Sequence, residues 1–176
     1  MSIYETLVEI IDLRSFSNLW YWIGLAVIWS SASHWVLGVP YDLVLRARRH
    51  GGQHYQDLQD LVRINVNRIL GIVEISGMWL VGFVSFMLTG LTLLSFWYDV
   101  EFAQALFFIA FPMTFVGMMS YTTARQIRRD APEGEALFAL LSRHRFFVQL
   151  IGMLALLVTA MFGMYQNLTL GPFQDL

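Results

Sequence analysis

Residues 75–96 read ISGMWLVGFVSFMLTGLTLLSF and contain no charged side chain. A helix rises about 1.5 Å per residue, so about 20 apolar residues cross a hydrocarbon core roughly 30 Å thick. This stretch is therefore predicted to be a transmembrane helix. We expect the helix to begin earlier, near Leu58, because the preceding apolar side chains share one helical face: Leu58, Leu61, Val62 and Ile69.

Three further apolar stretches, 19–39, 102–121 and 146–165, are long enough to cross a bilayer and are bounded by charged or turn-forming residues. The chain is 57% hydrophobic, which is too apolar for an ordinary soluble domain of 176 residues. The sequence therefore predicts an all-α membrane protein. Residues 1–176 are expected to form a single bundle with four transmembrane helices.

The basic residues predict how this bundle is oriented. All eleven are arginine, and ten of them fall in the segments 40–74 and 122–145. Basic segments next to transmembrane helices stay on the cytoplasmic side. Both segments are therefore predicted to be cytoplasmic, with the amino and carboxyl termini outside. The aromatic residues Trp20, Trp97 and Tyr165 lie at the other ends of the stretches, as expected of an outer aromatic belt.

Residues 1–15 are predicted to be an outer interfacial segment rather than a cleaved signal peptide. They lack a basic leading region, so the first apolar stretch is expected to remain as an anchor. Their apolar residues have helical spacing and are opposed by acidic ones: Ile3, Leu7, Ile10 and Ile11 against Glu5, Glu9 and Asp12.

The absence of cysteine from the sequence limits the chemistry that the chain can carry. It excludes disulfides, thiolate zinc sites, cysteine-ligated iron–sulfur clusters and a cysteine nucleophile within the chain. No nucleophile–histidine–acid arrangement, glycine-rich phosphate loop or pair of catalytic carboxylates is found in the sequence either. We therefore expect no catalytic activity and no metal site.

His34 is the first candidate site residue. Counted along a helix from Trp20, it lies about 21 Å inward, roughly 9 Å short of the inner boundary. Ionisable groups at that depth are costly and usually face the bundle interior. His34 is expected to share a face with the small residues Ala26, Ser30 and Ser33. It could bind haem or quinone or relay protons, or it could be a neutral histidine that donates a hydrogen bond across a helix interface.

Glu74 is the second candidate. It lies 23 positions from Trp97, about 35 Å along a helix, which places it at the inner boundary of the bilayer. Arg68 and Arg143 are predicted near the same level and could pair with its carboxylate. The alternatives are a cofactor contact near His34 and an interfacial ion pair or snorkelling carboxylate.

The other histidines do not favour a haem held by two histidines of one chain. Such a haem needs two imidazoles at one depth on facing helices. His144 is predicted at the inner interface, about 32 Å from Tyr165, and His50 and His54 lie in the first cytoplasmic segment. None of the three matches the depth of His34. We therefore expect no cofactor, with haem or quinone as the alternative.

The arginines near the predicted helix ends are candidate contacts for anionic lipid or for an acidic protein partner. Clusters of this kind bind anionic headgroups, including cardiolipin, and the forked guanidinium suits carboxylate and phosphate groups. An equal alternative is that they only set the topology. Nucleic acid is not an expected partner, because the clusters lie at the membrane surface. The candidate residues are Arg46, Arg48, Arg49, Arg125, Arg128, Arg129, Arg143 and Arg145.

Four motifs in the first 70 residues carry a family resemblance: RSFSNLW (14–20), SHWVLGVPYD (33–42), RARRHGG (46–52) and DLVRINVNR (60–68). The chain resembles a family of small four-helix membrane proteins from photosynthetic and marine alphaproteobacteria. Members of that family are often labelled as a component of the SUF iron–sulfur assembly complex. The resemblance implies a bacterial inner-membrane setting. The labelled activity is not carried over, because the chain has no cysteine to handle a cluster and that machinery is soluble.

Together these features favour a non-catalytic accessory or assembly subunit of a larger inner-membrane complex, including a bioenergetic one. Its expected partners are other membrane-protein subunits and anionic lipid. The main alternative is a redox protein that binds quinone or haem through His34, with Glu74 nearby. A small transporter or channel is a weaker third hypothesis, since only one clearly intramembrane ionisable residue is predicted.

Overall fold

The computed structural model describes residue 16 and residues 18–169 of the chain. Five helices account for most of them: α2 (Leu19–His34), α3 (Tyr41–His50), α4 (Gly52–Phe96), α5 (Glu101–Asp130) and α6 (Glu135–Thr169). Two short strands, β1 (Trp35–Val36) and β2 (Val39–Pro40), separate α2 from α3. The predicted amphipathic segment at the amino terminus lies outside the described residues.

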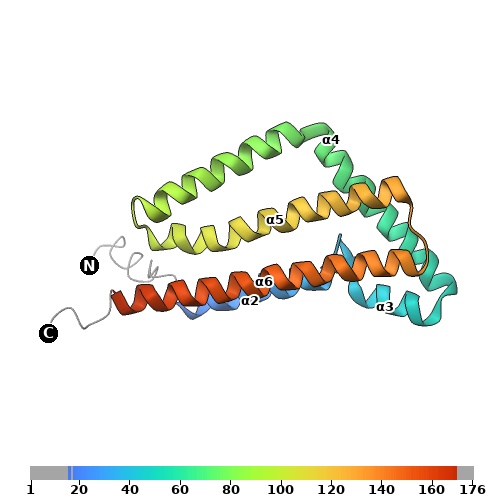
Figure 1. Ribbon diagram of the computed structural model, residues 1–176, viewed down its shortest axis with the longest axis horizontal. Coiled ribbons are helices and arrows are strands. Elements are labelled where there is room, and N and C mark those ends of the chain that lie inside the picture. Colours follow the sequence, from blue (N-terminus) through green and yellow to red (C-terminus); the bar gives the residue numbers. More distant parts are fainter. Residues whose placement is uncertain (1–15, 17, 170–176) are drawn as a thin grey trace, which may run out of the picture.

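Three helices are long and apolar enough to cross a membrane: Gly52–Phe96, Glu101–Asp130 and Glu135–Leu168. The predicted continuation of the second apolar stretch toward the amino terminus is confirmed, since α4 is one helix of 45 residues. Figure 1 shows that α4 changes direction near its middle, that α5 lies between α4 and α6, and that α2 runs alongside α6.

The first predicted stretch, 19–39, is only partly helical. The side chain of Asn18 caps the start of α2 by accepting a hydrogen bond from the Trp20 backbone N–H at 3.0 Å. The helix ends at His34 after 16 residues, and the chain turns back through an antiparallel pairing of Val36 with Val39. Leu37 and Gly38 both have positive φ, 52° and 76°, as a tight two-residue hairpin requires. The turn residues Leu37 and Gly38 thus lie inside the predicted stretch 19–39.

Helix α2 and Phe16, which precedes it, pack on α6 through two close contacts between an aromatic residue and a glycine. Trp29 is buried against Gly152, where an added Cβ would lie 2.8 Å from the Trp29 Cε3 atom. Phe16 is buried against Gly163, where an added Cβ would lie 3.2 Å from its Cδ1 atom. The absence of side chains at these two glycines lets the aromatic rings reach the α6 backbone.

A hydrophobic core lies at one end of the molecule, which we call the arginine-rich end: β1, β2, α3, residues 52–74 of α4, 121–130 of α5 and 135–148 of α6. Four residues of α4, spaced four apart, form its spine: Leu58, Val62, Val66 and Leu70. They pack against apolar side chains of the other elements: Val36, Leu37, Val39, Val44, Ala47, Ala124, Leu137, Phe138 and Leu141. This end therefore has a continuous core of its own.

Candidate functional site at the arginine-rich end

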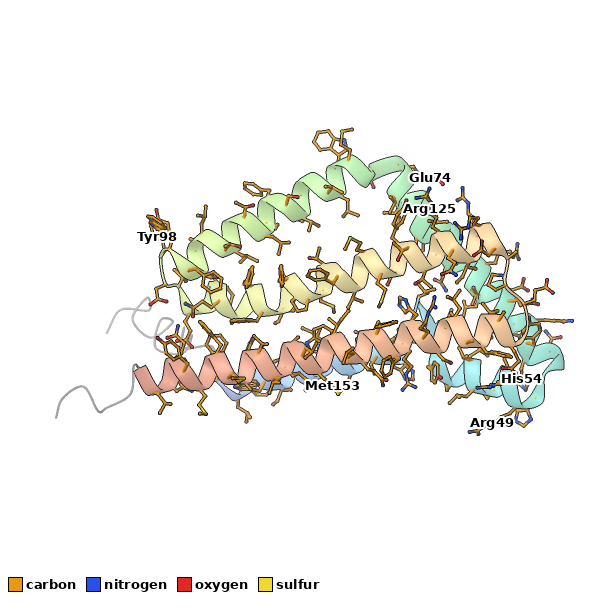
Figure 2. The ribbon with its side chains drawn as sticks, viewed as in Figure 1. Arg49, His54, Glu74, Tyr98, Arg125 and Met153 are labelled. Atoms are coloured by element: carbon orange, nitrogen blue, oxygen red, sulfur yellow. The ribbon has the colours of Figure 1, made fainter. Side chains whose placement is uncertain are left out.

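The arginine-rich end gathers nearly all the sequence-predicted site residues on the surface around its core. Figure 2 labels four charged or ionisable residues there: Arg49, His54, Glu74 and Arg125. Arg49 and His54 lie near the junction of α3 and α4, and Glu74 and Arg125 lie together at the bend of α4. The two groups are at opposite edges of this end.

His34 does not lie in the bundle interior. It is the last residue of α2, and its side chain is 54% exposed, with Nε2 3.8 Å from Oδ1 of Asp42. Asp42 also accepts a hydrogen bond from Arg46 at 2.8 Å. The small residues Ala26 and Ser30 are exposed, because α2 buries its Leu25 and Trp29 side instead. The resulting group is a surface cluster of histidine, carboxylate and guanidinium.

Glu74 forms an ion pair with neither of the expected arginines, Arg68 and Arg143. Its Oε1 atom lies 2.9 Å from Nη2 of Arg128 on α5. Both side chains are more than half exposed, so the pair itself stabilises the fold by at most about 1 kcal/mol. The main effect of the pair is on the position of α5 relative to α4, because it joins the two helices at the bend of α4.

Four of the eight candidate arginines have acidic partners within the described part of the chain. Arg48 lies 3.1 Å from Glu135, and Arg46 and Arg128 are paired with Asp42 and Glu74 as described. Arg129 donates to Asp130 at 2.7 Å, and this hydrogen bond lowers the pKa of Asp130 at the end of α5, beyond the predicted membrane segment 102–121. Arg49, Arg125 and Arg143 have no ion pair or hydrogen bond with any residue in the described part of the chain.

Arg145 has a structural role that the sequence did not indicate. Its Nε donates to the backbone carbonyl of Ser33 at 3.1 Å, and its guanidinium lies 3.9 Å from the centre of the Tyr41 ring. The hydroxyl groups of Tyr41 and Ser142 are hydrogen-bonded at 3.2 Å. A guanidinium at a helix carboxyl terminus satisfies a free carbonyl and complements the helix dipole. Arg145 therefore joins α6 to the last turn of α2 and to the start of α3.

Replacing Arg145 by glutamine should destabilise the folded protein by roughly 1–3 kcal/mol, because a charge-assisted hydrogen bond and a cation–π contact are lost together. The measurement is the free energy of unfolding in detergent micelles. Arg49→Gln is the matched control, since Arg49 is exposed and has no partner among the described residues. Equal stability of the two variants would show that Arg145 does not hold α2 in place.

His144 is buried at the arginine-rich end, two residues before the predicted membrane segment 146–165. Only 4% of the residue is exposed, and its Nδ1 atom lies 3.1 Å from the hydroxyl of Thr123 on α5. Burial lowers the pKa of His144 to about 4, so the imidazole is neutral at physiological pH. His144 therefore contributes a neutral α5–α6 contact and adds no positive charge.

The opposite end of the molecule holds a buried amide network that sequence reasoning missed. Gln104 is 1% exposed, and its Nε2 donates to the Ser95 carbonyl at 2.9 Å and to Asp99 at 2.7 Å. Its Oε1 accepts from Gln166 of α6 at 2.8 Å. The sequence did contain a signal for this network: Gln104 and Gln166 lie on two different apolar helices, and buried amides need hydrogen-bond partners. The network fixes the α4–α5 turn against α6.

His50 and His54 form no metal site with other residues in the described part of the chain. The rings of His50 and His54 lie 5.8 Å apart, and residues 16 and 18–169 contain no group of three or more histidine, cysteine, aspartate or glutamate side chains suited to a metal ion. Figure 1 shows α5 between the α2–α6 pair and the membrane-length half of α4, so the helices that carry His34 and Glu74, α2 and α4, lie on opposite sides of α5.

The fold thus defines a helical protein with three helices long and apolar enough to span a membrane. No protein-family model, curated protein or solved structure matches the chain.

Proposed function

We propose that this protein is a non-catalytic accessory or assembly subunit of a larger membrane complex. One observation carries the proposal: α4 has no buried residue between Leu70 and Ser95. Many of its apolar side chains there are exposed, including Ile75 (88%), Met78 (89%), Trp79 (83%) and Phe86 (71%), while others, among them Val84 and Leu88, are partly buried. Lipid can cover such a surface, and so can the helices of other membrane proteins.

The contrast within α4 supports a docking role. The same helix buries four residues in the core of the arginine-rich end and none along the following 24 positions, 71–94. A helix held firmly at its ends and exposed in between can present its surface to a neighbouring helix without giving up internal contacts. We infer that this half of α4 is the main partner-binding surface of the protein.

The proposed setting is the bacterial inner membrane, with four crossings and both termini outside. In this arrangement α2 is a crossing helix in addition to α4, α5 and α6. The arrangement is supported by the gathering of arginines at one end and by exposed aromatic residues at the other, among them Trp20 (76%) and Trp97 (81%). The family resemblance of the first 70 residues supports the bacterial setting. A SUF-related activity is not part of the proposal.

Site-specific photocrosslinking in native membranes tests the proposed function. A photoreactive amino acid at Met78 should give a covalent adduct with one particular membrane protein, which should also co-purify in a fixed ratio in mild detergent. The matched position is Val27 on α2, which is 59% exposed but lies outside the proposed surface. Purification as a lone monomer or homo-oligomer, or adducts that are the same from both positions, would contradict the proposal.

A further inference from the structure

We propose that Arg125 binds the phosphate of an anionic membrane phospholipid whose acyl chains lie along α5. The site rests on the proposed membrane orientation and goes beyond the proposed subunit role. It is separate from the α4 surface described above, because its residues come from one stripe of α5.

Arg125 is the arginine best placed for a phosphate. The ion pair with Glu74 directs Arg128 toward the bend of α4, and residues three apart lie on the same side of a helix. Arg125 therefore lies one turn closer to the apolar part of α5, and Figure 2 shows it beside Glu74 at the bend. The carboxylate of Glu74 is occupied by Arg128, while Arg125 is exposed and has no partner among the described residues. The three side chains together carry one unbalanced positive charge.

Seven residues, or two helical turns, before Arg125, an exposed apolar stripe begins in the membrane-length part of α5. Helical spacing places Met118, Phe115 and Phe111 on the side of Arg125, and they are 59%, 46% and 45% exposed. The centroids of the Phe111 and Phe115 rings lie 5.1 Å apart in an edge-to-face contact, so the deeper part of the stripe is aromatic. From Arg125 to Phe111 the helix rises about 21 Å, which matches a headgroup plus the acyl chains of one leaflet.

This combination favours a phospholipid over an acidic protein segment. A guanidinium at the headgroup level binds a phosphate by charge-assisted hydrogen bonds, and the apolar stripe that begins two turns deeper is complementary to acyl chains. An acidic segment would use Arg125 but would leave the stripe without a function. The phosphate and the acyl chains of one lipid molecule account for both features.

Native mass spectrometry of the purified chain can count the bound lipid. The protein is first equilibrated with mixed micelles of phosphatidylglycerol and phosphatidylcholine in equal amounts. We expect the natural sequence to retain phosphatidylglycerol preferentially, and Arg125→Gln to reduce its apparent affinity about fivefold or more, as loss of one surface charge implies. Arg49→Gln, at the other edge of the arginine-rich end, should retain the lipid. Arg125→Lys should keep most of the binding, which separates loss of the charge from misfolding.

A second pair of variants tests the acyl-chain contact. Met118→Gln should weaken retention of phosphatidylglycerol, whereas Met153→Gln, at a similarly exposed methionine of α6, should not. Equal losses for Arg125→Gln and Arg49→Gln, unchanged binding in Arg125→Gln, or displacement of the lipid by inorganic phosphate alone would each overturn the proposal. Because the lipid is counted on the isolated chain, failure of the proposed subunit role would not change the result.

Discussion

The Leu141→Ala variant should unfold about 2–5 kcal/mol more easily than the natural sequence, the usual cost of a cavity left by a buried leucine. Leu141 is fully buried in α6, where it packs in the core of the arginine-rich end with Leu58 and Val62 of α4. The neighbouring helices are held by their own contacts, so the core cannot collapse fully onto the smaller side chain. The free energy of unfolding is measured by denaturant titration in detergent micelles.

The matched control for this variant is Leu157→Ala on the same helix. Leu157 is 57% exposed and contributes nothing to the core of the arginine-rich end, so its replacement should change stability by less than about 1 kcal/mol. If both variants lost the same stability, the arginine-rich end would not be the main folded core of the protein.

Replacing Gly152 by valine should separate α2 from α6. An added Cβ at Gly152 would lie 2.8 Å from Cε3 and 3.2 Å from Cδ2 of Trp29, and Trp29 is itself buried. Neither ring atom belongs to a flexible side-chain end, so α2 must move away or the ring must leave its site. We expect a loss of roughly 1–3 kcal/mol or more, as for other overpacked contacts. The loss should be accompanied by faster proteolysis of the connection between α2 and α3.

Gly82→Val is the control for the Gly152 substitution, because nothing lies within 4 Å of an added Cβ at Gly82 on α4. It introduces the same side chain into another apolar helix and should leave stability and proteolysis nearly unchanged. A stable Gly152→Val protein with an intact α2–α6 contact would show that the close approach of Trp29 is not required.

The sequence predicted the long apolar helices well, because hydrophobic length is a local property. The residues 75–96, 102–121 and 146–165 all fall inside helices of membrane-spanning length, and the extension of α4 before Ile75 was also expected. The end of α2 at His34 was not predicted from the sequence. The backbone turns at Leu37 and Gly38, and the Asn65 amide donates to the Gly38 carbonyl at 3.4 Å from 27 positions away, a contact that local patterns do not reveal.

Pairings between distant side chains could not be predicted for the same reason. Depth along a helix placed Glu74 near several arginines, but the choice of Arg128 depends on the bend of α4 and on the rotation of α5. Arg145 looked like a surface charge, whereas its partner, the Ser33 carbonyl, lies 112 positions away in the sequence. Composition identified the basic residues, and only the packing of helices separated those with internal partners from those without.

The orientation of the arginine-rich end is the central claim, because the proposed membrane arrangement and the lipid site both depend on it. The chain has no cysteine, so single cysteines can be introduced and labelled without background. Two exposed positions distinguish the two ends: Tyr98 in the α4–α5 turn and Glu133 in the α5–α6 turn. With a membrane-impermeant maleimide, Tyr98→Cys should be labelled in intact spheroplasts, and Glu133→Cys only after permeabilisation. Labelling of Glu133→Cys in intact spheroplasts would contradict the account.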